Sequence, residues 1–265
     1  MYNGEFKIID TQEKAYMLGQ LYGDGYNGES GKSYKTSLAS IDKDAELYQH
    51  LNHLFPFFTL KHYKSHPNMV YLEANCKELY LDLCALGMVS NKTEKDKTEE
   101  FHFPQLEESL LPHFIRGYFD ADGSAWYPTR QRSRNNLHIE FGCNTPKFLS
   151  SLNDILNANG ICFSTNKRMK RAGNGKFYMS HILFSSNYTI SIKFANYIYK
   201  DSIIELSYKK ALCYRPKQLR PKLSAIYGNC PYCGSDHIIG NGIRNGNQRM
   251  ECKKCNKQFS RPLPK

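Results

Sequence analysis

The sequence predicts an α+β fold made of two similar units and a small C-terminal module. A helical pattern that ends in Asp-Gly at Asp24 recurs 98 residues later at Asp122, and similar strand-like and helix-like segments follow both copies. Four cysteines are grouped beyond residue 228. Each unit is expected to have the order α, β, β, α, β, β, α. A pseudo-two-fold axis would relate the units where the two Asp-Gly helices meet.

The composition fits a globular protein with a polyanionic partner. The 265 residues are 40% hydrophobic, enough for one large core or two moderate ones. No apolar run approaches the roughly 18–20 residues of a membrane span, and neither a signal-peptide pattern nor a basic amphipathic helix is present. The net charge of +11 favours nucleic acid as the partner. We expect a cytoplasmic, nucleoid-associated protein, or one in an organelle or a phage-infected cell.

The first unit is predicted to occupy residues 1–89. Asp10 or Thr11 is placed to cap the first helix, and Glu13 would complete a capping box from Asp10. The composition of residues 27–33 predicts a turn that joins a hairpin. The remaining elements are a strand over 34–41, a helix over 44–55, strands over 57–64 and 69–74, and a helix over 77–86.

The second unit is predicted to occupy residues 105–214, after a charged linker over 90–104. Its first helix begins near Pro112 and ends near Asp122. The elements that follow are a strand over 136–143, a helix over 147–159, strands over 161–171 and 176–184, and a helix over 188–199. The order of the first unit is thereby repeated.

The two Asp-Gly helices share a stripe of small residues. Gly19 and Gly23 in the first copy correspond to Gly117 and Ala121 in the second. Residues four apart lie on one helix face, so this stripe predicts close packing of the two backbones. The glycines that end the motifs, at positions 25 and 123, are predicted to be left-handed C-caps.

The acids of these motifs predict a metal site. Asp24 and Asp122 fall in last turns, where the helix dipole disfavours a carboxylate. Packing alone accounts for the small residues but not for two acids at equivalent, adjoining helix ends. A cation between them would resolve the conflict. Oxygen ligands and incomplete protein coordination suit Mg²⁺.

The segment Ile115-Arg-Gly-Tyr-Phe-Asp-Ala-Asp-Gly123 resembles the signature of the LAGLIDADG homing endonucleases, and residues 17–25 resemble a degenerate first copy. The first copy has Tyr22 where the second has Asp120, but the last Asp, which carries metal in the family, is present in both. The resemblance implies a single-chain, two-repeat endonuclease that cuts both DNA strands across the minor groove and leaves staggered ends. The implied Mg²⁺ ligands are Asp24, Asp122, Gly23 and Ala121.

The family also places a lysine near each scissile phosphate, where it can stabilise developing negative charge. Lys92, which follows the closing helix of the first unit, resembles one of these lysines. Lys209 resembles the other, with Lys210 as the next choice. The alternative for each is a solvated surface lysine.

The resemblance further implies curved antiparallel sheets that follow the DNA major groove. Such sheets need basic and amide side chains on the exposed face. The first unit offers Lys35, Lys61, His62 and Lys64, and the second offers Arg130, Arg132, Arg134, Asn135, Asn136, His138, Lys167, Arg168, Lys170 and Arg171. The alternative is that these charges only solvate a sheet face.

The C-terminal region predicts a zinc site after a basic, proline-containing linker over 215–227. In residues 228–265, Cys230-x-x-Cys233 and Cys252-x-x-Cys255 are separated by 18 residues, a spacing typical of tetrahedral Zn²⁺. The region resembles a zinc ribbon, and zinc is expected to fold it because it is too small to do so alone. Its basic residues predict DNA contact beside the main footprint: Arg244, Arg249, Lys253, Lys254, Lys257 and Arg261. The alternative is a structural or protein-contacting ribbon.

Two other functions stay open at this level. An intron RNA splicing maturase would keep both acids and the basic sheets, whereas a non-cleaving DNA-binding regulator would lose an acid. We expect a monomer with double-stranded DNA, or alternatively intron RNA, as its partner. An intein is not expected, because residue 1 is not a nucleophile and residue 265 is not Asn. We expect a free-standing or intron-encoded protein instead.

Overall fold

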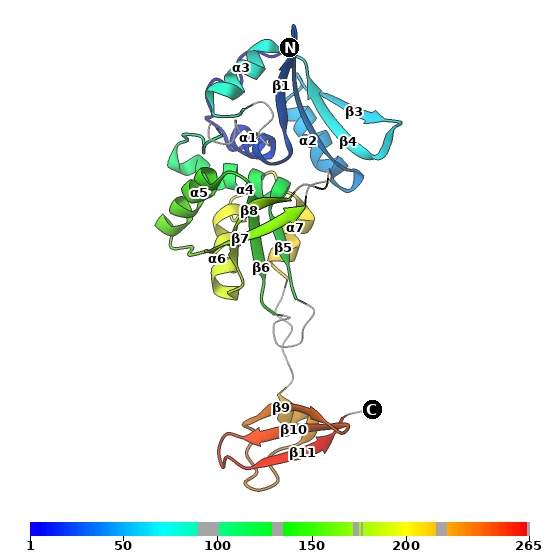
Figure 1. Ribbon diagram of the computed structural model, residues 1–265, viewed down its shortest axis with the longest axis vertical. Helices are drawn as coiled ribbons and strands as arrows, with labels where there is room; N and C mark the ends of the chain where they lie inside the picture. Colours follow the sequence, from blue (N-terminus) through cyan, green and yellow to red (C-terminus); the bar gives the residue numbers. More distant parts are fainter. Residues whose placement is uncertain (90–100, 129–134, 172–174, 176, 216–221, 264–265) are drawn as a thin grey trace. The chain divides into compact units, whose positions relative to one another are not determined.

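The computed structural model describes residues 1–89, 101–128, 135–171, 175, 177–215 and 222–263 (Figure 1). The chain divides into two compact units, residues 1–215 and 216–265. Within the described ranges, no helix has the length and apolar character needed to cross a bilayer. The fold is mixed α+β with antiparallel sheets, as predicted.

The first repeat has the predicted order of elements. They are α1 (Gln12–Asp24), β1 (Tyr26–Ser30), β2 (Ser33–Ile41), the 3₁₀ turn η1 (Asp42–Asp44), α2 (Ala45–Leu54), β3 (Thr59–Tyr63), β4 (His66–Ala74) and α3 (Lys77–Ala85). The strands form an antiparallel sheet in the order β1-β2-β4-β3. All three α-helices contact strands of this sheet.

The second repeat has the same order. Its elements are η3 (Glu108–Leu110), α4 (Leu111–Asp122), β5 (Ser124–Trp126), β6 (His138–Cys143), α5 (Pro146–Ala158), β7 (Ser164–Arg171), β8 (Phe177–Ser185) and α6 (Tyr188–Tyr199), followed by α7 (Ser207–Cys213). The strand order β5-β6-β8-β7 matches that of the first sheet. The prediction of two repeated sheet and helix units is therefore confirmed.

The predicted turn over 27–33 was wrong in extent. β1 occupies most of it, and only residues 31 and 32 connect β1 to β2. Asn27 is buried, and two hydrogen bonds satisfy its side-chain amide. It accepts one from Thr36 Oγ1 at 2.7 Å and donates one to the carbonyl of Tyr80 at 3.2 Å. These two partners allow a turn-forming residue to lie in a strand, and local composition does not reveal them.

The helix ends agree with the predictions in part. Thr11, one of the two predicted caps, caps α1 by accepting from the Lys14 amide at 3.3 Å, whereas Asp10 pairs with Lys14 Nζ at 2.7 Å and forms no capping box. Gly25 and Gly123 are extended, with φ −78° and ψ 149° and 155°, so the left-handed caps were wrong. The chain passes directly into β1 and β5. A Cβ at position 25 would lie 2.3 Å from the Leu21 carbonyl oxygen, so glycine is needed for space.

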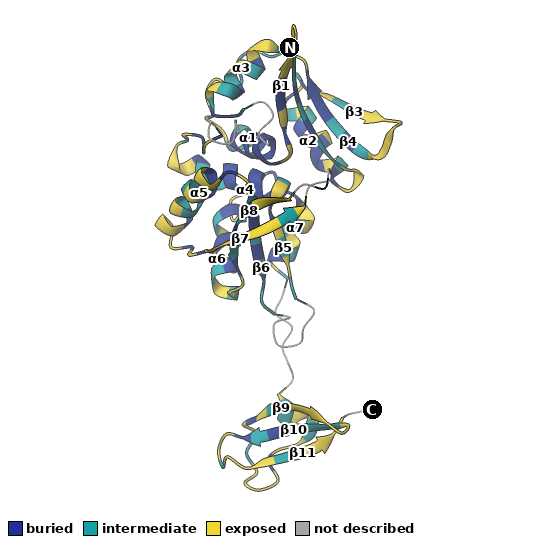
Figure 2. Ribbon diagram, in the orientation of Figure 1, coloured by how far each residue is buried: buried dark blue, intermediate teal, exposed yellow. Residues whose placement is uncertain are grey.

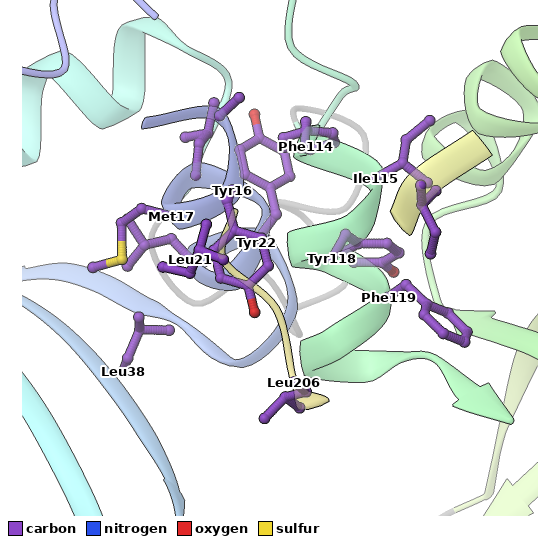
Figure 3. Close-up of a cluster of buried hydrophobic side chains, with 14 of the residues drawn as sticks. Tyr16, Met17, Leu21, Tyr22, Leu38, Phe114, Ile115, Tyr118, Phe119 and Leu206 are labelled. Atoms are coloured by element: carbon purple, nitrogen blue, oxygen red, sulfur yellow. The ribbon is translucent and has the colours of Figure 1, made fainter. Parts of the chain in front are cut away.

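One hydrophobic core extends through both repeats (Figures 2 and 3). Tyr22 from α1 packs against Phe114 from α4 and Phe148 from α5, with ring centroids 5.2 Å and 5.9 Å away. Phe101, in the segment predicted as linker, is 3% exposed and lies 5.0 Å from the Tyr22 ring. The end of that linker is therefore part of the core, because its aromatic side chain is buried.

The C-terminal unit is a small three-stranded module. It contains α8 (Leu223–Tyr227), β9 (Ile238–Arg244), β10 (Asn247–Cys252) and β11 (Gln258–Pro262), with the strand order β11-β10-β9. Its buried core consists of Cys230, Ile238, Met250 and Cys252. Leu223 of α8 packs on this core, so part of the predicted linker is helical and joins the module. Such a small core requires additional stabilisation.

Candidate functional site

Helices α1 and α4 approach each other through backbone atoms. A Cβ added to Gly19 would lie 2.1 Å from the carbonyl oxygen of Phe114, and one added to Gly117 would lie 2.0 Å from that of Tyr16. Real Cβ atoms do not come so close to backbone oxygen, so neither position accepts a side chain. The small-residue stripe thus fixes the register of the two helices.

The same contact brings the two helix ends together. A Cβ on Gly23 would lie 2.4 Å from the Cβ of Ala121 and 3.4 Å from that of Asp122. Asp24 and Asp122 are exposed where their helices end, and Gly23 is buried between them. The groups at these helix ends that could bind a metal ion are carboxylates and main-chain carbonyls. This oxygen-only set fits a hard divalent cation such as Mg²⁺.

Lys209 lies at the end of α4 rather than on a solvated surface. Its Nζ donates hydrogen bonds to the carbonyl oxygens of Phe119, Asp120 and Gly123 at 2.8, 2.7 and 2.7 Å. All three ammonium protons therefore cap the last turn of α4. Burial lowers the pKa of Lys209, whereas the charges of four carboxylates, Asp120, Asp24, Asp44 and Asp122, oppose that change. Its placement beside the acids suits a residue that positions them.

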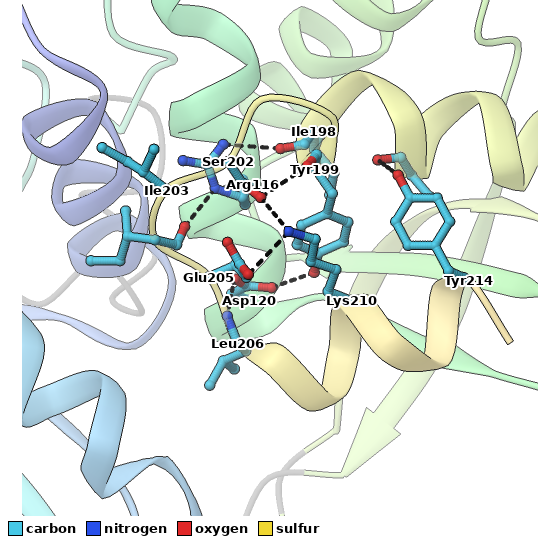
Figure 4. A network of polar contacts seen from close by, with 12 residues as sticks. Arg116, Asp120, Ile198, Tyr199, Ser202, Ile203, Glu205, Leu206, Lys210 and Tyr214 are labelled. Atoms are coloured by element: carbon cyan, nitrogen blue, oxygen red, sulfur yellow. Dashed lines mark hydrogen bonds and ion pairs between the residues drawn. The ribbon is translucent and has the colours of Figure 1, made fainter.

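Asp120 is the centre of a buried polar network (Figure 4). Its carboxylate accepts hydrogen bonds from Tyr16 Oη at 2.9 Å, Tyr199 Oη at 2.5 Å and the Leu206 amide at 2.8 Å. Burial raises the pKa of Asp120 to about 6 against these hydrogen bonds. The network joins α1, α4, α6 and the segment before α7. In the first repeat Tyr22 instead donates to the carbonyl of Leu86 at 2.6 Å.

Arg116 is a second member of this region that the sequence pattern did not single out. It is fully buried, and its Nε and Nη1 donate to the carbonyls of Ile204 and Ile198 at 2.8 and 2.9 Å. Nη1 also lies 2.7 Å from His113 Nδ1. An arginine in the middle of an apolar helix is the signal that could have found it. Figure 4 shows that these contacts tie α4 to the turn after α6.

The first sheet carries the predicted lysines Lys35 and Lys61 around one acid. Glu73 is 6% exposed and lies 2.6 Å from Lys35 Nζ and 2.8 Å from Lys61 Nζ, and Tyr63 Oη donates to it at 2.8 Å. Burial raises the pKa of Glu73, but the three hydrogen bonds outweigh it and lower the pKa to about 2. Lys64 is exposed. Sequence reasoning missed Glu73 because its partners come from two neighbouring strands.

The second sheet presents three of its predicted DNA-contacting residues fully to solvent, namely Lys167, Arg168 and Arg171. Strand β7 is exposed along nearly its whole length (Figure 2). Arg168 pairs with Glu140 through contacts of 3.2 and 3.3 Å, and His138 lies 5.1 Å from the Trp126 ring. Lys167 and Arg171 are exposed, and Asn135 and Asn136 are partly buried. Lys92, Arg130, Arg132 and Arg134 lie outside the described residues.

A cavity of about 200 Å³ adjoins Asp122. Lys170, Asn144, Thr145 and Ser180 are among its lining residues. Lys170, predicted as a DNA contact on the outer strand, therefore reaches the same cavity as one of the two acids. Its Nζ lies 3.3 Å from the position of a Cβ on Gly142, so the absence of a side chain at that glycine leaves room for the ammonium group.

The four C-terminal cysteines form one cluster. Their Sγ atoms all lie within 4.8 Å of one another, with Cys230 and Cys255 3.7 Å apart and Cys233 and Cys252 3.5 Å apart. Sulfurs at 2.3 Å from a tetrahedral zinc ion would be about 3.8 Å apart. The Cys-x-x-Cys turns are alike, since the amides of residues 234 and 256 bond the carbonyls of Cys230 and Cys252 at 2.9 and 2.8 Å. The geometry fits a zinc ribbon.

The predicted basic residues of the module lie mostly on its surface. Lys253 Nζ contacts Glu251 at 2.5 Å, which offsets part of its charge. The remaining predicted contacts are exposed, namely Arg244, Arg249, Lys254, Lys257 and Arg261. The module therefore presents an excess of exposed positive charge.

Residues 110–199 match the family model described as a LAGLIDADG-like domain. The match begins just before α4 and ends with α6, so it includes Asp122 and the second sheet. The family resemblance expected from the sequence is confirmed for this repeat.

Solved structures of LAGLIDADG proteins are similar to the chain. The homing endonuclease I-DmoI, in a study of its mesophilic variants, has a TM-score of 0.48 and 18% identity over 76% of this chain and 95% of that chain. The LAGLIDADG meganuclease I-AabMI bound to uncleaved DNA has a TM-score of 0.46 and 14% identity, covering 74% of this chain and 85% of that chain. I-DmoI in complex with DNA and Mn has a TM-score of 0.47 and 16% identity, covering 72% and 98%. A comparison with curated proteins gives no match.

Proposed function

We propose that the chain is a site-specific double-strand DNA endonuclease of the LAGLIDADG homing type. The observation that carries the proposal is the convergence of α1 and α4, whose backbone contact brings the ends bearing Asp24 and Asp122 together. The LAGLIDADG-like domain that contains α4 supports the same function.

In this proposal a divalent cation, expected to be Mg²⁺, is bound by Asp24 and Asp122 together with the main-chain carbonyls of Gly23 and Ala121. When bound, it would activate water and neutralise charge at the scissile phosphate. The chain's own contribution is rigidity. The glycine contacts prevent the helices from sliding, and Lys209 holds the last turn of α4 through three hydrogen bonds. Lys92 remains the proposed lysine of the other half-site.

The sheets and the C-terminal module would hold the DNA. A net charge of +11 supplies the general attraction to a polyanion. On the first sheet Glu73 orders Lys35 and Lys61, whereas β7 of the second sheet offers exposed Lys167 and Arg171. In the C-terminal module, the four cysteines would bind Zn²⁺ as a structural ion. The exposed arginines and lysines of this module would contact DNA beside the part of the duplex that the two sheets bind. We propose that a monomer suffices, because one chain carries both repeats.

The proposal is tested by selecting cleaved sites from a random or genomic DNA library in the presence of Mg²⁺ or EDTA. We expect Mg²⁺-dependent cleavage of both strands at one sequence. Asp24→Asn and Asp122→Asn should each abolish cutting and preserve binding, while Asp154→Asn, at an exposed acid of α5, should behave as wild type. Full activity of either acid variant would refute the metal site. RNA binding with no DNA cleavage by the wild type would instead favour the maturase.

A further inference from the structure

Lys209, the lysine expected to face a phosphate beside Asp122, has its ammonium group fully engaged within the protein. Its Nζ donates to the carbonyl oxygens of Phe119, Asp120 and Gly123 at 2.8, 2.7 and 2.7 Å. A lysine has three N–H donors and no more, so none is left for a ligand. A cation that contacts a scissile phosphate beside Asp122 would therefore have to come from another residue.

The open face of the second sheet carries such a residue, Lys170 of β7. Lys170 pairs with Tyr178 of β8, and Gly142 of β6 pairs with Ile182 of β8. Side chains alternate along a strand, so this register puts Lys170 and Gly142 on one face of the sheet, opposite the face that buries Phe141 in the core. Lys170 Nζ lies 3.3 Å from the position of a Cβ on Gly142. The lysine therefore extends across β8 to β6.

The end of β6 lies beside the end of α4. Tyr118, one turn before Asp122, stacks on Phe141, with ring centroids 5.8 Å apart and an interplanar angle of 4°. The next residue, Gly142, lines the cavity of about 200 Å³ together with Asp122 and Lys170. Its other polar lining groups are the amide of Asn144 and the hydroxyls of Thr145, Tyr178 and Ser180. Lysine, hydroxyl and amide groups are the side chains that contact nucleic-acid phosphates.

The ammonium group of Lys170 is available to an anion. In the part of the chain that the structure describes, it makes no hydrogen bond or ion pair. Arg168 lies on the same face of β7 but pairs with Glu140 at 3.2 and 3.3 Å. Lys170 is also half-buried, so a phosphate beside it would be partly shielded from water, where the attraction between opposite charges is stronger.

We propose that Lys170 contacts the scissile phosphate of the half-site at Asp122, in place of Lys209. The inference rests on the proposed function and departs from the lysine that the family resemblance implies. In the cleavage step, a water oxygen bonds to phosphorus and loses a proton to solvent, while the bond from phosphorus to the leaving oxygen breaks and that oxygen takes up a proton. Lys170 transfers no proton. Its ammonium group stabilises the negative charge that develops on the phosphoryl oxygens, and Lys209 caps α4.

Strand-specific cleavage under single-turnover conditions tests this role. Each strand of a cleaved duplex is labelled in turn, and the protein is saturating, so that the rates report the chemical step. Lys170→Met should slow one strand about 100-fold and leave the other at the wild-type rate, whereas Lys170→Arg, which keeps the charge, should slow it less. Lys200→Met, at an exposed lysine after α6, is the matched control. Wild-type cleavage of both strands by Lys170→Met would overturn the inference.

DNA binding in EDTA gives a second readout that does not depend on the catalytic cation. Loss of one phosphate contact should reduce the slope of log Kd against log salt concentration by about 0.9 in Lys170→Met. A wild-type slope would show that Lys170 contacts no phosphate. A reduced slope with wild-type cleavage of both strands would make Lys170 a binding contact only, which also contradicts the proposal.

Lys209→Met separates the two lysines. It should lower the melting temperature, because three main-chain carbonyls lose their shared donor. A wild-type melting temperature combined with slow cleavage of the strand expected for Lys170 would return the phosphate contact to Lys209. If the wild type cuts no DNA, the proposed function fails and this inference fails with it. Cleavage by the wild type that Lys170→Met leaves unchanged refutes the inference alone.

Discussion

Asp120→Asn tests the energetic effect of the carboxylate buried between the two repeats. The pKa of Asp120 is raised from 3.8 to about 6 by burial, so between these values the folded chain keeps a proton that the unfolded chain has lost. The contribution of Asp120 to the free energy of unfolding must therefore fall as pH rises from about 4 to about 6. Two pKa units correspond to about 3 kcal/mol, present below pH 4 and lost above pH 6.

The assay is urea unfolding at pH 4, 5, 6 and 7, followed by fluorescence of Trp126, the single tryptophan, which lies in β5 of the N-terminal unit. Asn cannot ionise, so the wild-type minus Asp120→Asn difference isolates this group, and any lost hydrogen bond to the Leu206 amide adds a pH-independent offset. A difference that stays constant would refute the reasoning. One that rises with pH would mean that the bonds from Tyr16 and Tyr199 outweigh burial. Asp154→Asn is the matched exposed control.

Gly117→Ala should destabilise the N-terminal unit by about 3 kcal/mol, because its methyl would meet the Tyr16 carbonyl 2.0 Å away; a thermal melt within a degree of wild type would contradict this. Glu73→Gln should release Lys35 and Lys61, so that DNA binding measured by anisotropy becomes tighter and more salt-dependent; an unchanged salt slope would show that these lysines do not reach phosphate. Cys252→Ser should release zinc to a colorimetric chelator and unfold the C-terminal module while Trp126 fluorescence stays constant; retained zinc would exclude the four-thiolate site.

Much of the architecture was predictable because it depends on periodic patterns. The order of helices and strands follows from apolar spacing, and the repeated Asp-Gly motif correctly predicted the pairing of α1 with α4. The grouped cysteines likewise predicted their own cluster. In each case the residues that meet are specified by short-range spacing or by an internal repeat.

The remainder depends on partners distant in sequence. Glu73 gains its low pKa from lysines on two other strands, and Asn27 lies in a strand only because Thr36 and Tyr80 satisfy its amide. The terminal glycines were predicted to have positive φ, but their role is steric, set by the helix each one leaves.

The contact of Gly19 and Gly117 with carbonyl oxygens has a consequence for recombining halves of related chains. Backbone atoms limit the approach of the helices, so rotamer changes elsewhere cannot adjust the spacing between their ends. A chimera that replaces the first repeat must supply glycine opposite Phe114 and an open surface opposite position 117. Exchange of whole repeats is therefore limited by the backbone contact of this helix pair, in addition to the hydrophobic core that the two repeats share.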